Sequence, residues 1–334
     1  MLAQENKFSV FKTNPDDIQV DQSLRPKSFS DFIGQDKLKS SLKIAMKAAN
    51  ERKESLEHIL FSGPPGLGKT SLSHLIAKEQ NKNIKITSGP ALERLGDLAA
   101  ILTSLEEGDI LFIDEIHRLN RLVEEAFYPA LEEFALDIIL GKGPGAKTLR
   151  LDLPKFTLIG ATTRPSLLSS PLRDRFGFHY QLNFYQKEEI GDIIKRSAKI
   201  LSLKINDDAV REIADRSRST PRIANRLLKR VRDFAQVKKR SVDAELVHEA
   251  LSLFEVDKLG LTTNDRRLLN ILIDKFNGGP VGLKTLSIAL NEEIASLEDL
   301  YEPYLLQIGF LERTSRGRKA SGLAYKYLEK EKTV

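Results

Sequence analysis

A glycine-rich octapeptide constrains this chain more than any other segment, because its pattern is typical of one local fold. Residues 63–70 read Gly-Pro-Pro-Gly-Leu-Gly-Lys-Thr and match the phosphate-loop pattern G-x-x-x-x-G-K-[ST] at every position. The apolar residues 59–61 predict a short buried strand before the loop, and the apolar spacing in 71–78 predicts a helix after it. A strand, a glycine-rich turn and a helix N-terminus make an anion site. The sequence therefore predicts an α/β domain that binds phosphate groups, rather than a glycine-rich loop without a ligand.

The composition is that of a globular chain of two or three domains. At 334 residues the chain can hold two or three units of about 100–200 residues each. It contains no cysteine, which excludes disulfides and thiolate zinc sites. No apolar run approaches the roughly 18 residues that span a bilayer, and the N-terminus lacks the order of a signal peptide. We therefore expect a cytoplasmic protein.

The patterns along the chain change twice. Strand and helix patterns alternate between residues 59 and 185, which predicts a parallel sheet with helices on both faces. Within this part, a Gly/Pro cluster with apolar flanks over 138–151 predicts a projecting hairpin. Helical spacing alone follows, so we predict an α/β domain over 1–185, a helical domain over 186–256 and a third domain over 257–334.

The last domain has the element order of a winged helix. Helical spacing covers 264–275, 283–290 and 296–308. Apolar segments at 310–314 and 320–325 then flank a basic turn, which predicts a two-stranded hairpin. Three helices followed by a basic hairpin is the order found in winged-helix DNA-binding domains.

An apolar run that ends in two acids follows the phosphate loop. Residues 109–113 predict a strand, and Asp114 and Glu115 follow it directly. Ligands of an open α/β sheet lie at the carboxyl ends of its strands, so we expect Asp114 beside the phosphate loop, where it orients a Mg²⁺ shell. Glu115 is then placed to polarise an attacking water. His117 lies close by and is expected to be structural.

Hydroxyls and arginines follow the next predicted strand. That strand ends in Thr162 and Thr163, either of which could bond a γ-phosphate or the attacking water. Arg173 and Arg175 come shortly afterwards. An arginine supplied across a subunit boundary can neutralise transition-state charge on the γ-phosphate. The alternative for these two arginines is a surface ion pair with Asp174, which would stabilise the fold little.

A further arginine stands at the start of a predicted helix. Thr220 is expected to cap this helix, and Pro221 and Arg222 fall in its first turn. A cation is unfavourable at a helix N-terminus because of the helix dipole. We therefore expect a bound phosphate near Arg222.

Positive charge is concentrated in two places. Residues 186–240 contain 16 Lys and Arg against 8 Asp and Glu, and most of these residues are expected on solvated helical faces. The C-terminal hairpin carries Arg313, Arg316, Arg318 and Lys319. Spaced arginines on such a hairpin fit phosphate contacts in a DNA groove and predict sequence-independent, salt-dependent binding. A solvated turn is the alternative.

In their order along the chain, the phosphate loop, the acidic pair (here called the acidic box), the hydroxyls and the arginines resemble the motifs of the AAA+ ATPases. Further segments resemble the RuvB family, the bacterial motors of Holliday-junction branch migration. The closer resemblance extends over roughly residues 22–325. The phosphate loop and the acidic box are generic to many ATPases, whereas the other segments are more specific. These segments are Ser88–Pro90, Gly96–Ala100, Tyr128–Ala130, Gly160–Pro165, Pro171–Gly177, Thr220–Asn225, Gly278–Leu283 and Glu302–Leu305. The implied fold is an AAA+ P-loop ATPase with a parallel sheet core, a helical lid and a C-terminal winged helix.

The resemblance implies a role for each matching residue. Thr163 falls on the γ-phosphate sensor, Arg175 on an arginine finger that acts in a neighbouring subunit, and Arg222 on a second sensor in the lid. Arg313 and Arg318 fall on DNA contacts. The implied catalytic residues are Lys69, Asp114, Glu115, Thr163 and Arg175, and the metal ligands are Thr70 and Asp114. The implied nucleotide-binding residues are Leu24, Arg25, Gly63, Gly66, Leu67, Gly68, Lys69, Thr70, Ser71, Glu132, Glu133, Phe134, Arg175, Tyr185 and Arg222.

The resemblance also implies ATP and Mg²⁺ as cofactors and a homo-hexameric ring that moves the duplex DNA of Holliday junctions. The hairpin 138–150 corresponds to the element that docks on the junction-binding partner RuvA, and the RuvC resolvase complex is a further implied partner. In this hairpin, Gly145 and Lys147 stand where Ala and Arg are usual. Two alternatives stay open at this point. One is an ATP switch like a clamp loader or replication initiator, and the other is a winged-helix transcription regulator with an ATPase input domain.

Overall fold

A computed structural model describes residues 22–140 and 147–330 of the chain and divides it into two compact units. Arg25–Phe184 form one unit, here called the α/β unit. Tyr185–Val334, together with the segment that ends at Leu24, form the other, here called the C-terminal unit. None of the described helices has the length and apolar character needed to cross a membrane.

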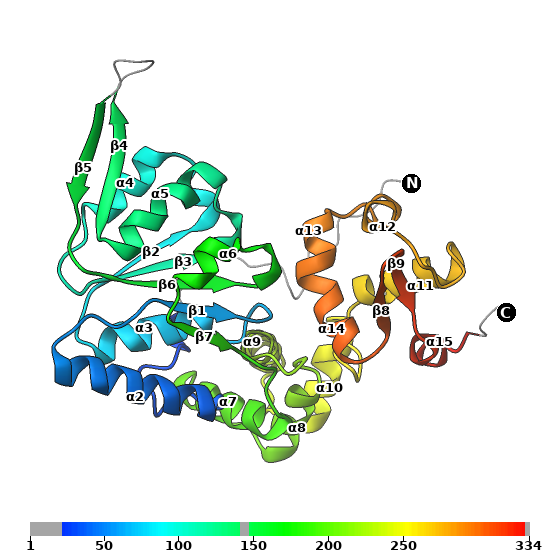
Figure 1. Ribbon diagram of the computed structural model, residues 1–334. Helices are drawn as coiled ribbons and strands as arrows, with labels where there is room; N and C mark the ends of the chain where they lie inside the picture. The colour runs from blue at the N-terminus through cyan, green and yellow to red at the C-terminus, as the bar shows by residue number, and fades with distance from the viewer. Residues whose placement is uncertain (1–21, 141–146, 331–334) are drawn as a thin grey trace. The chain divides into compact units, whose positions relative to one another are not determined.

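The α/β unit is built on a five-stranded parallel sheet with the order β2-β3-β6-β1-β7 (Figure 1). The central strand β6 is buried along its whole length, as expected when helices cover both faces of a parallel sheet. This confirms the predicted α/β core and, apart from small differences at the strand ends, the strands predicted before the phosphate loop, before Asp114 and before Thr163. The strands are β1 (Ile59–Ser62), β2 (Ile84–Ser88), β3 (Ile110–Asp114), β6 (Thr157–Thr162) and β7 (Phe178–Gln181).

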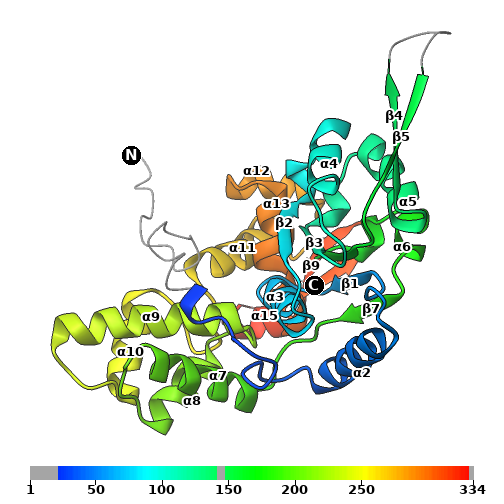
Figure 2. The same cartoon turned by 90° about the vertical axis from the view of Figure 1, so that its left-hand side faces the viewer.

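Helices cover the sheet on both faces. The helices of this unit are α2 (Asp36–Arg52), α3 (Lys69–Glu79), α4 (Leu95–Leu102), α5 (Arg121–Glu132) and α6 (Ser170–Asp174), with 3₁₀ turns at Gly89–Ala91, Ile116–Arg118 and Pro165–Leu167. Side chains of α4, α5 and α6 share one apolar core with Leu111 and Ile113 of β3 and Leu158 of β6. Helix α3 lies on the opposite side of the sheet (Figures 1 and 2). The order of strands and helices brings the loops that follow β1, β3 and β6 to one edge.

The predicted hairpin is present as the antiparallel pair β4 (Ala135–Leu140) and β5 (Lys147–Asp152). Ala135 pairs with Asp152 at its base, and the backbones of Leu140 and Lys147 are the last described pair. Residue Gly145, one of the two departures from the family pattern, lies outside the described residues. The base of the hairpin belongs to the α/β core, since Ala135 and Leu136 are buried.

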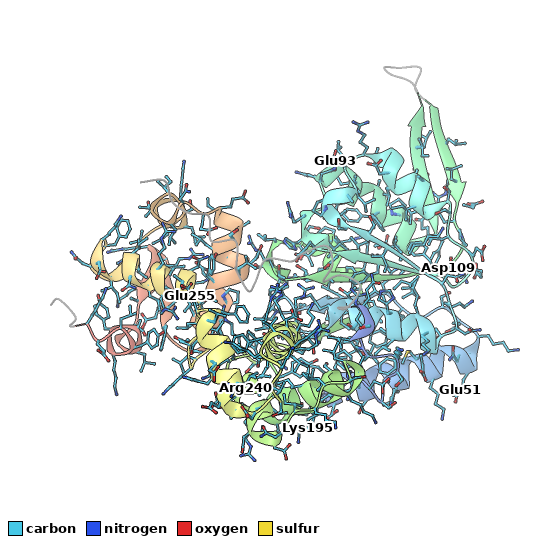
Figure 3. The ribbon with its side chains drawn as sticks, turned by 180° about the vertical axis from the view of Figure 1, so that it is seen from behind. Glu51, Glu93, Asp109, Lys195, Arg240 and Glu255 are labelled. Carbon is cyan, nitrogen blue, oxygen red and sulfur yellow. The ribbon has the colours of Figure 1, made fainter. Side chains whose placement is uncertain are left out.

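The first part of the C-terminal unit is helical, as predicted. Its helices are α7 (Lys187–Ile200), α8 (Asp207–Asp215), α9 (Pro221–Lys238) and α10 (Ala244–Leu253). Asn206 and Asp243 cap α8 and α10 with their side chains. Much of the basic excess of this region lies on the surface in ion pairs, such as Lys195 with Asp207 and Arg240 with Glu249. Figure 3 labels Lys195 and Arg240 on this helical part.

The second part has the element order of a winged helix, with two differences from the prediction. Its elements are α11 (Thr263–Asp274), α12 (Leu283–Leu290), α13 (Ile294–Ser296), a π-helical turn (Leu297–Tyr301), α14 (Glu302–Gln307), β8 (Leu311–Thr314), β9 (Gly317–Ala320) and α15 (Gly322–Tyr327). The helix predicted over 296–308 is present, but it contains a π-helical turn directly before Glu302 and Pro303, where Pro303 has no backbone N–H to donate. The strand predicted at 320–325 is wrong. Ser321 accepts a hydrogen bond from Ala324 N and starts a helix there.

A buried ion pair joins the two parts of the C-terminal unit. The Arg218 guanidinium bonds the Asp265 carboxylate, and the two side chains are 4% and 0% exposed. Arg218 also stacks on the ring of Tyr304, whose pKa burial raises to about 12. A charge buried this deeply is tolerated only with such a partner, so the pair fixes the loop before α9 against α11 and α14.

Candidate nucleotide site

The phosphate loop joins β1 to α3 and takes the backbone conformation that its glycines allow. Gly63, Gly66 and Gly68 all have positive φ, of 133°, 80° and 107°. A Cβ on Gly63 would lie 2.6 Å from the carbonyl oxygen of Leu182, so a larger residue cannot replace it without moving the backbone. Gly68 is the N-cap of α3 and has no side chain to cap the first turn, which leaves room for an anion there.

Lys69 directs its charge into this loop. Its side chain is buried, and Nζ donates hydrogen bonds to the carbonyl oxygens of Gly63 at 2.7 Å and Pro64 at 2.9 Å. The same helix turn carries Thr70 and Ser71, because α3 begins at Lys69. The ammonium, the first-turn amides and the Thr70 hydroxyl therefore belong to one helix N-terminus, the place where phosphate binding is favoured by the dipole.

The acidic pair lies at the carboxyl end of β3, as predicted. Asp114 is the last residue of that strand, and an oxygen of its carboxylate accepts a hydrogen bond from the Glu115 amide at 3.0 Å. Glu115 has a φ of 48°, which is uncommon for a residue with a side chain. Backbone strain of this kind collects at functional sites, where a side chain must point in one direction.

Two neighbours hold the Glu115 carboxylate, and both come from residues singled out in the sequence. Thr163 Oγ1 donates to Glu115 Oε2 at 3.1 Å. His117 Nδ1 lies 3.2 Å from the same oxygen and 2.9 Å from Thr162 Oγ1. The structure thus brings Glu115 and Thr163 together, and it adds a contact for His117 that the sequence did not indicate.

The candidate metal ligands suit magnesium. Thr70 offers a hydroxyl and Asp114 a carboxylate, which are the hard oxygen ligands that Mg²⁺ prefers. Residues 22–140 and 147–330 contain no group of three His, Cys, Asp or Glu side chains arranged to hold a metal. A protein cage is therefore lacking in these residues, whereas Mg²⁺ usually takes its remaining ligands from phosphate and water.

The candidate arginine finger follows α6 and is held within its own chain. One terminal nitrogen of Arg175 donates to the Pro171 carbonyl at 2.6 Å, and the other lies 3.1 Å from Glu132 Oε1. The guanidinium lies over the Tyr128 ring, 4.2 Å from its centroid. In the described part of the chain neither Arg173 nor Arg175 pairs with Asp174, so the simple ion pair considered from the sequence is absent there.

The other implied nucleotide residues of the α/β unit have varied surroundings. Arg25 lies 3.4 Å from His74 Nε2, and burial together with this guanidinium lowers the pKa of His74. Glu133 pairs with Arg150 at the base of the hairpin. Phe134 has a φ of 51° and packs edge-on against the Phe156 ring, which is a core contact.

Three implied residues belong to the C-terminal unit. Leu24 is buried, and its carbonyl accepts a hydrogen bond from Arg196 at 2.7 Å. Tyr185 is also buried, and its amide donates to the Ser219 carbonyl. Arg222 is exposed in the first turn of α9. The predicted cap is wrong in detail. Thr220 occupies the N-cap position, but its hydroxyl donates to the Arg218 carbonyl instead of capping the helix.

Comparison with known proteins decides the family. Three family models match successive parts of the chain: the Holliday junction DNA helicase RuvB P-loop domain over residues 24–182, the RuvB AAA lid domain over 185–257 and the RuvB C-terminal winged helix domain over 258–329. The chain belongs to the RuvB family.

Relatives in this family are similar over almost their whole length. A Holliday junction branch migration complex subunit RuvB of Dehalococcoides mccartyi is 60% identical over 329 residues, which cover 98% of this chain and 94% of the relative. The Chloroflexus aurantiacus subunit of the same name is 58% identical over 95% of this chain and 91% of its own. The solved structure of the Thermotoga maritima RuvB Holliday junction branch migration motor matches with a TM-score of 0.86 at 50% identity, covering 93% of this chain and 99% of that one.

A more distant match shows the fold alone. The Aeropyrum pernix ORC2 protein matches with a TM-score of 0.53 at 15% identity, covering 84% of this chain and 88% of that one. RuvB-family membership and the described site together make the chain an AAA+ ATPase with a helical lid and a winged helix.

The wing of this RuvB-family chain contains a residue that sequence reasoning missed. Glu302, 1% exposed at the start of α14, accepts hydrogen bonds from Arg313 at 2.7 and 3.0 Å and from Arg318 at 2.5 and 3.1 Å. Arg316 lies exposed in the turn between β8 and β9. The candidate DNA arginines thus differ, since two are held by one buried carboxylate and the third is at the tip. The only sequence signal for Glu302 was its place in the family segment Glu302–Leu305.

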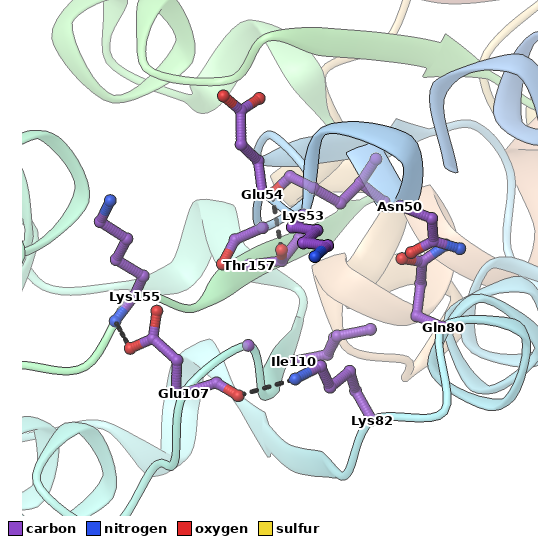
Figure 4. Close-up of a pocket in the computed structure, with 12 residues that line it drawn as sticks. Asn50, Lys53, Glu54, Gln80, Lys82, Glu107, Ile110, Lys155 and Thr157 are labelled. Carbon is purple, nitrogen blue, oxygen red and sulfur yellow. Dashed lines mark hydrogen bonds between the residues drawn. The ribbon is translucent and has the colours of Figure 1, made fainter. Parts of the chain in front are cut away.

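A pocket of about 360 Å³ in the α/β unit is separate from the nucleotide site (Figure 4). It is lined by Ile110 and Thr157, the first residues of β3 and β6, and by polar side chains that include Lys53, Lys82 and Glu107. The phosphate loop and the acidic pair follow the carboxyl ends of their strands, so this pocket lies at the other edge of the sheet.

Proposed function

We propose that this chain is an ATP-driven motor that moves duplex DNA to migrate the branch point of Holliday junctions, in recombination and repair. The observation that carries the proposal is the match of successive RuvB domain models to nearly the whole chain, and the hydrogen bond from Thr163 to Glu115 at the carboxyl ends of the strands supports it. The α/β unit supplies the ATPase, and the winged helix supplies the DNA contact. The domains we propose are the α/β domain 1–185, the lid 186–256 and the winged helix 257–334.

Hydrolysis begins with ATP seated on the phosphate loop. Lys69 neutralises charge on the β- and γ-phosphates, and the first turn of α3 binds them through its amides. Thr70 and Asp114 hold Mg²⁺, which when bound neutralises further phosphate charge. Glu115 polarises a water for in-line attack on the γ-phosphate, and Thr163 contacts the γ-phosphate while it restrains the Glu115 carboxylate.

The site is completed by residues from outside the phosphate loop. Leu24, Arg25 and Tyr185 hold the adenosine, and Arg222 senses the γ-phosphate from the lid. Arg175 acts in the site of a neighbouring subunit, where its guanidinium stabilises transition-state charge. Since each site then needs a neighbour, the working form is a closed ring, which we propose is a homo-hexamer.

We propose one partner for the wing and others for the hairpin 138–150 and the ring. The wing arginines contact DNA phosphates without regard to sequence. The hairpin 138–150 docks on RuvA, and the ring works in the complex that includes the RuvC resolvase. We also propose a cytoplasmic location.

The decisive experiment is branch migration of a synthetic four-way junction with ATP, with and without RuvA. We expect branch migration to separate the junction into two duplexes, at a rate that RuvA increases. The Glu115→Gln variant should bind ATP with nearly unchanged affinity and turn it over at least about a hundredfold more slowly, because general-base assistance is lost. Undiminished turnover in that variant would exclude Glu115 as the base. A separate Lys69→Ala variant should lose nucleotide binding itself.

A second candidate function is an ATP switch that changes shape on DNA without translocating. The phosphate loop, the acidic pair and Thr163 would serve such a switch as well as a motor, because both bind and hydrolyse ATP. Such a switch would bind the junction in an ATP-dependent manner and hydrolyse ATP once per binding event. Many turnovers per junction, accompanied by strand separation into two duplexes, would favour the motor.

A further inference from the structure

The surroundings of Arg175 are more ordered than a surface arginine requires. Its side chain is 18% exposed, and three groups of the same chain contact the guanidinium: the Tyr128 ring, the Pro171 carbonyl and the Glu132 carboxylate. Tyr128 and Glu132 belong to α5, and Pro171 belongs to α6, which lies beside α5 (Figures 1 and 2). Arg173, two residues earlier, is exposed and bonds only the nearby Ser170 hydroxyl among the described residues.

The Tyr128 ring is itself fixed in place. Its hydroxyl donates to Glu124 at 2.8 Å and lies 3.4 Å from the Ser169 hydroxyl. Ser169 also bonds Glu124 and caps α6 through the Leu172 amide. Residues of α5 and of the start of α6 therefore hold the hydroxyl of the Tyr128 ring, and the Arg175 guanidinium lies over the face of the ring. Aromatic faces attract guanidinium groups and align with their plane.

One donor of Arg175 remains unused in this arrangement. Its Nε is buried, and no hydrogen-bond partner for it exists among residues 22–140 and 147–330. An arginine has five N–H groups, and the contacts of Arg175 with Pro171 and Glu132 use only its terminal nitrogens. A buried donor without a partner costs free energy, so the arrangement is poorly explained as a device for stability alone.

The ion pair with Glu132 is a weak restraint by comparison. The Glu132 side chain is 56% exposed, and pairs of this kind contribute little because water screens them. A phosphate oxygen is a stronger partner for a guanidinium than a solvated carboxylate. The terminal nitrogen on Glu132 can therefore leave for a nucleotide at small cost, whereas the stack on Tyr128 can persist.

We propose that Tyr128 is a positioning residue for the Arg175 finger, and this inference rests on the proposed action of Arg175 in a neighbouring site. The ring fixes the plane and direction of the guanidinium before a neighbour's nucleotide arrives, so that less side-chain freedom is lost when the arginine reaches the γ-phosphate. Glu132 holds one terminal nitrogen of Arg175 until the neighbour's nucleotide arrives. Tyr128 itself touches neither nucleotide nor water.

The test uses mixed rings in which the two partners of one site carry different variants. An Arg175→Ala subunit has a complete phosphate loop but offers no finger, and a Glu115→Gln subunit offers a finger but hydrolyses nothing. An equimolar mixture should regain ATPase activity at sites where Arg175→Ala receives the finger of Glu115→Gln. Tyr128→Leu is then added either to the subunit that donates the finger or to the subunit that accepts it, and steady-state turnover and KM are measured.

The expected result depends on which subunit carries the change. On the donor, Tyr128→Leu should lower the regained turnover about three- to tenfold with KM nearly unchanged. On the acceptor, the same substitution should change it by less than about twofold, which also shows that the variant folds and assembles. Tyr128→Phe on the donor keeps the aromatic face and should retain most of the activity.

Two outcomes would overturn the proposal, and they can be told apart. Equal losses from donor and acceptor, or no loss from the donor, would show that Tyr128 does not position the finger. If the parent mixture of Arg175→Ala with Glu115→Gln regains no activity, the action of Arg175 across subunits fails before Tyr128 is changed, and the proposal fails with it.

Discussion

Two groups of functional arginines in this molecule are held by glutamates in opposite ways. In the α/β unit, Arg175 meets the 56% exposed carboxylate of Glu132. In the wing, Arg313 and Arg318 share the carboxylate of Glu302, which is 1% exposed. An ion pair in water is worth little, whereas a buried one is costly to break because one charge is then left without its partner.

The difference teaches which arginine can move. Arg175 can exchange its carboxylate for a phosphate at small cost, as a group that must reach another subunit requires. Arg313 on β8 and Arg318 on β9 both bond Glu302, and Arg318 is only 16% exposed, so this shared carboxylate fixes the shape of the wing. The proposed DNA-binding surface of the wing is therefore preformed, with Arg316 at its tip.

The largest expected effect follows from removing the movable arginine. Arg175→Ala should lower kcat for ATP hydrolysis by about a thousandfold or more, which is the usual contribution of an arginine finger. The melting temperature should fall only slightly, because the change removes one exposed ion pair, one hydrogen bond to the Pro171 carbonyl and one stack. Steady-state ATPase assays test the change in kcat, and thermal unfolding of the same preparation tests the melting temperature. A variant that melts much earlier but still hydrolyses ATP would reverse the assignment.

The second effect concerns Arg313 and Arg318, which Glu302 holds in place. Glu302→Gln keeps the size of the side chain but removes the charge that Arg313 and Arg318 share, and we expect the wing to lose about 3 kcal/mol of local stability. Hydrogen exchange of residues 311–320 in the full-length protein should then become about a hundredfold faster, while exchange in α3 is unchanged. Unchanged exchange in the wing would mean that Glu302 does not hold these strands.

The sequence predicted the local structure of the phosphate loop well because the residues that form it are neighbours in the chain. The phosphate loop needs only a strand, eight residues and a helix start, and its glycine conformations follow from the pattern. The placement of Asp114, Glu115 and Thr163 at one edge followed from the rule that parallel strands end together. Strand and helix alternation was sufficient for that inference.

Contacts between distant segments could not be predicted in the same way. The pairs of Arg175 with Glu132 and of Arg318 with Glu302 depend on how helices pack, and charged residues are common on any surface. The helix at 322–327 was missed, because short apolar segments fit a strand or a helix equally well. The Thr220 hydroxyl was also assigned wrongly, since Arg218 and Ser219 both take positive φ before it and redirect its bond.

The smallest expected effect comes from the matched substitution at the exposed site. Glu132→Gln removes one charge, as Glu302→Gln does, but the loss should cost less than about 1 kcal/mol because the carboxylate is solvated. Hydrogen exchange in α5 and α6 should therefore change by less than about fivefold. The two substitutions make the same chemical change, but Glu302 is buried between two arginines whereas Glu132 is exposed and pairs with one, so the ratio of the two effects measures what burial and the second partner add. If Glu132→Gln destabilises α6 as strongly as Glu302→Gln destabilises the wing, Arg175 is a fixed structural residue, and its release to a neighbouring subunit would be too costly for a working finger.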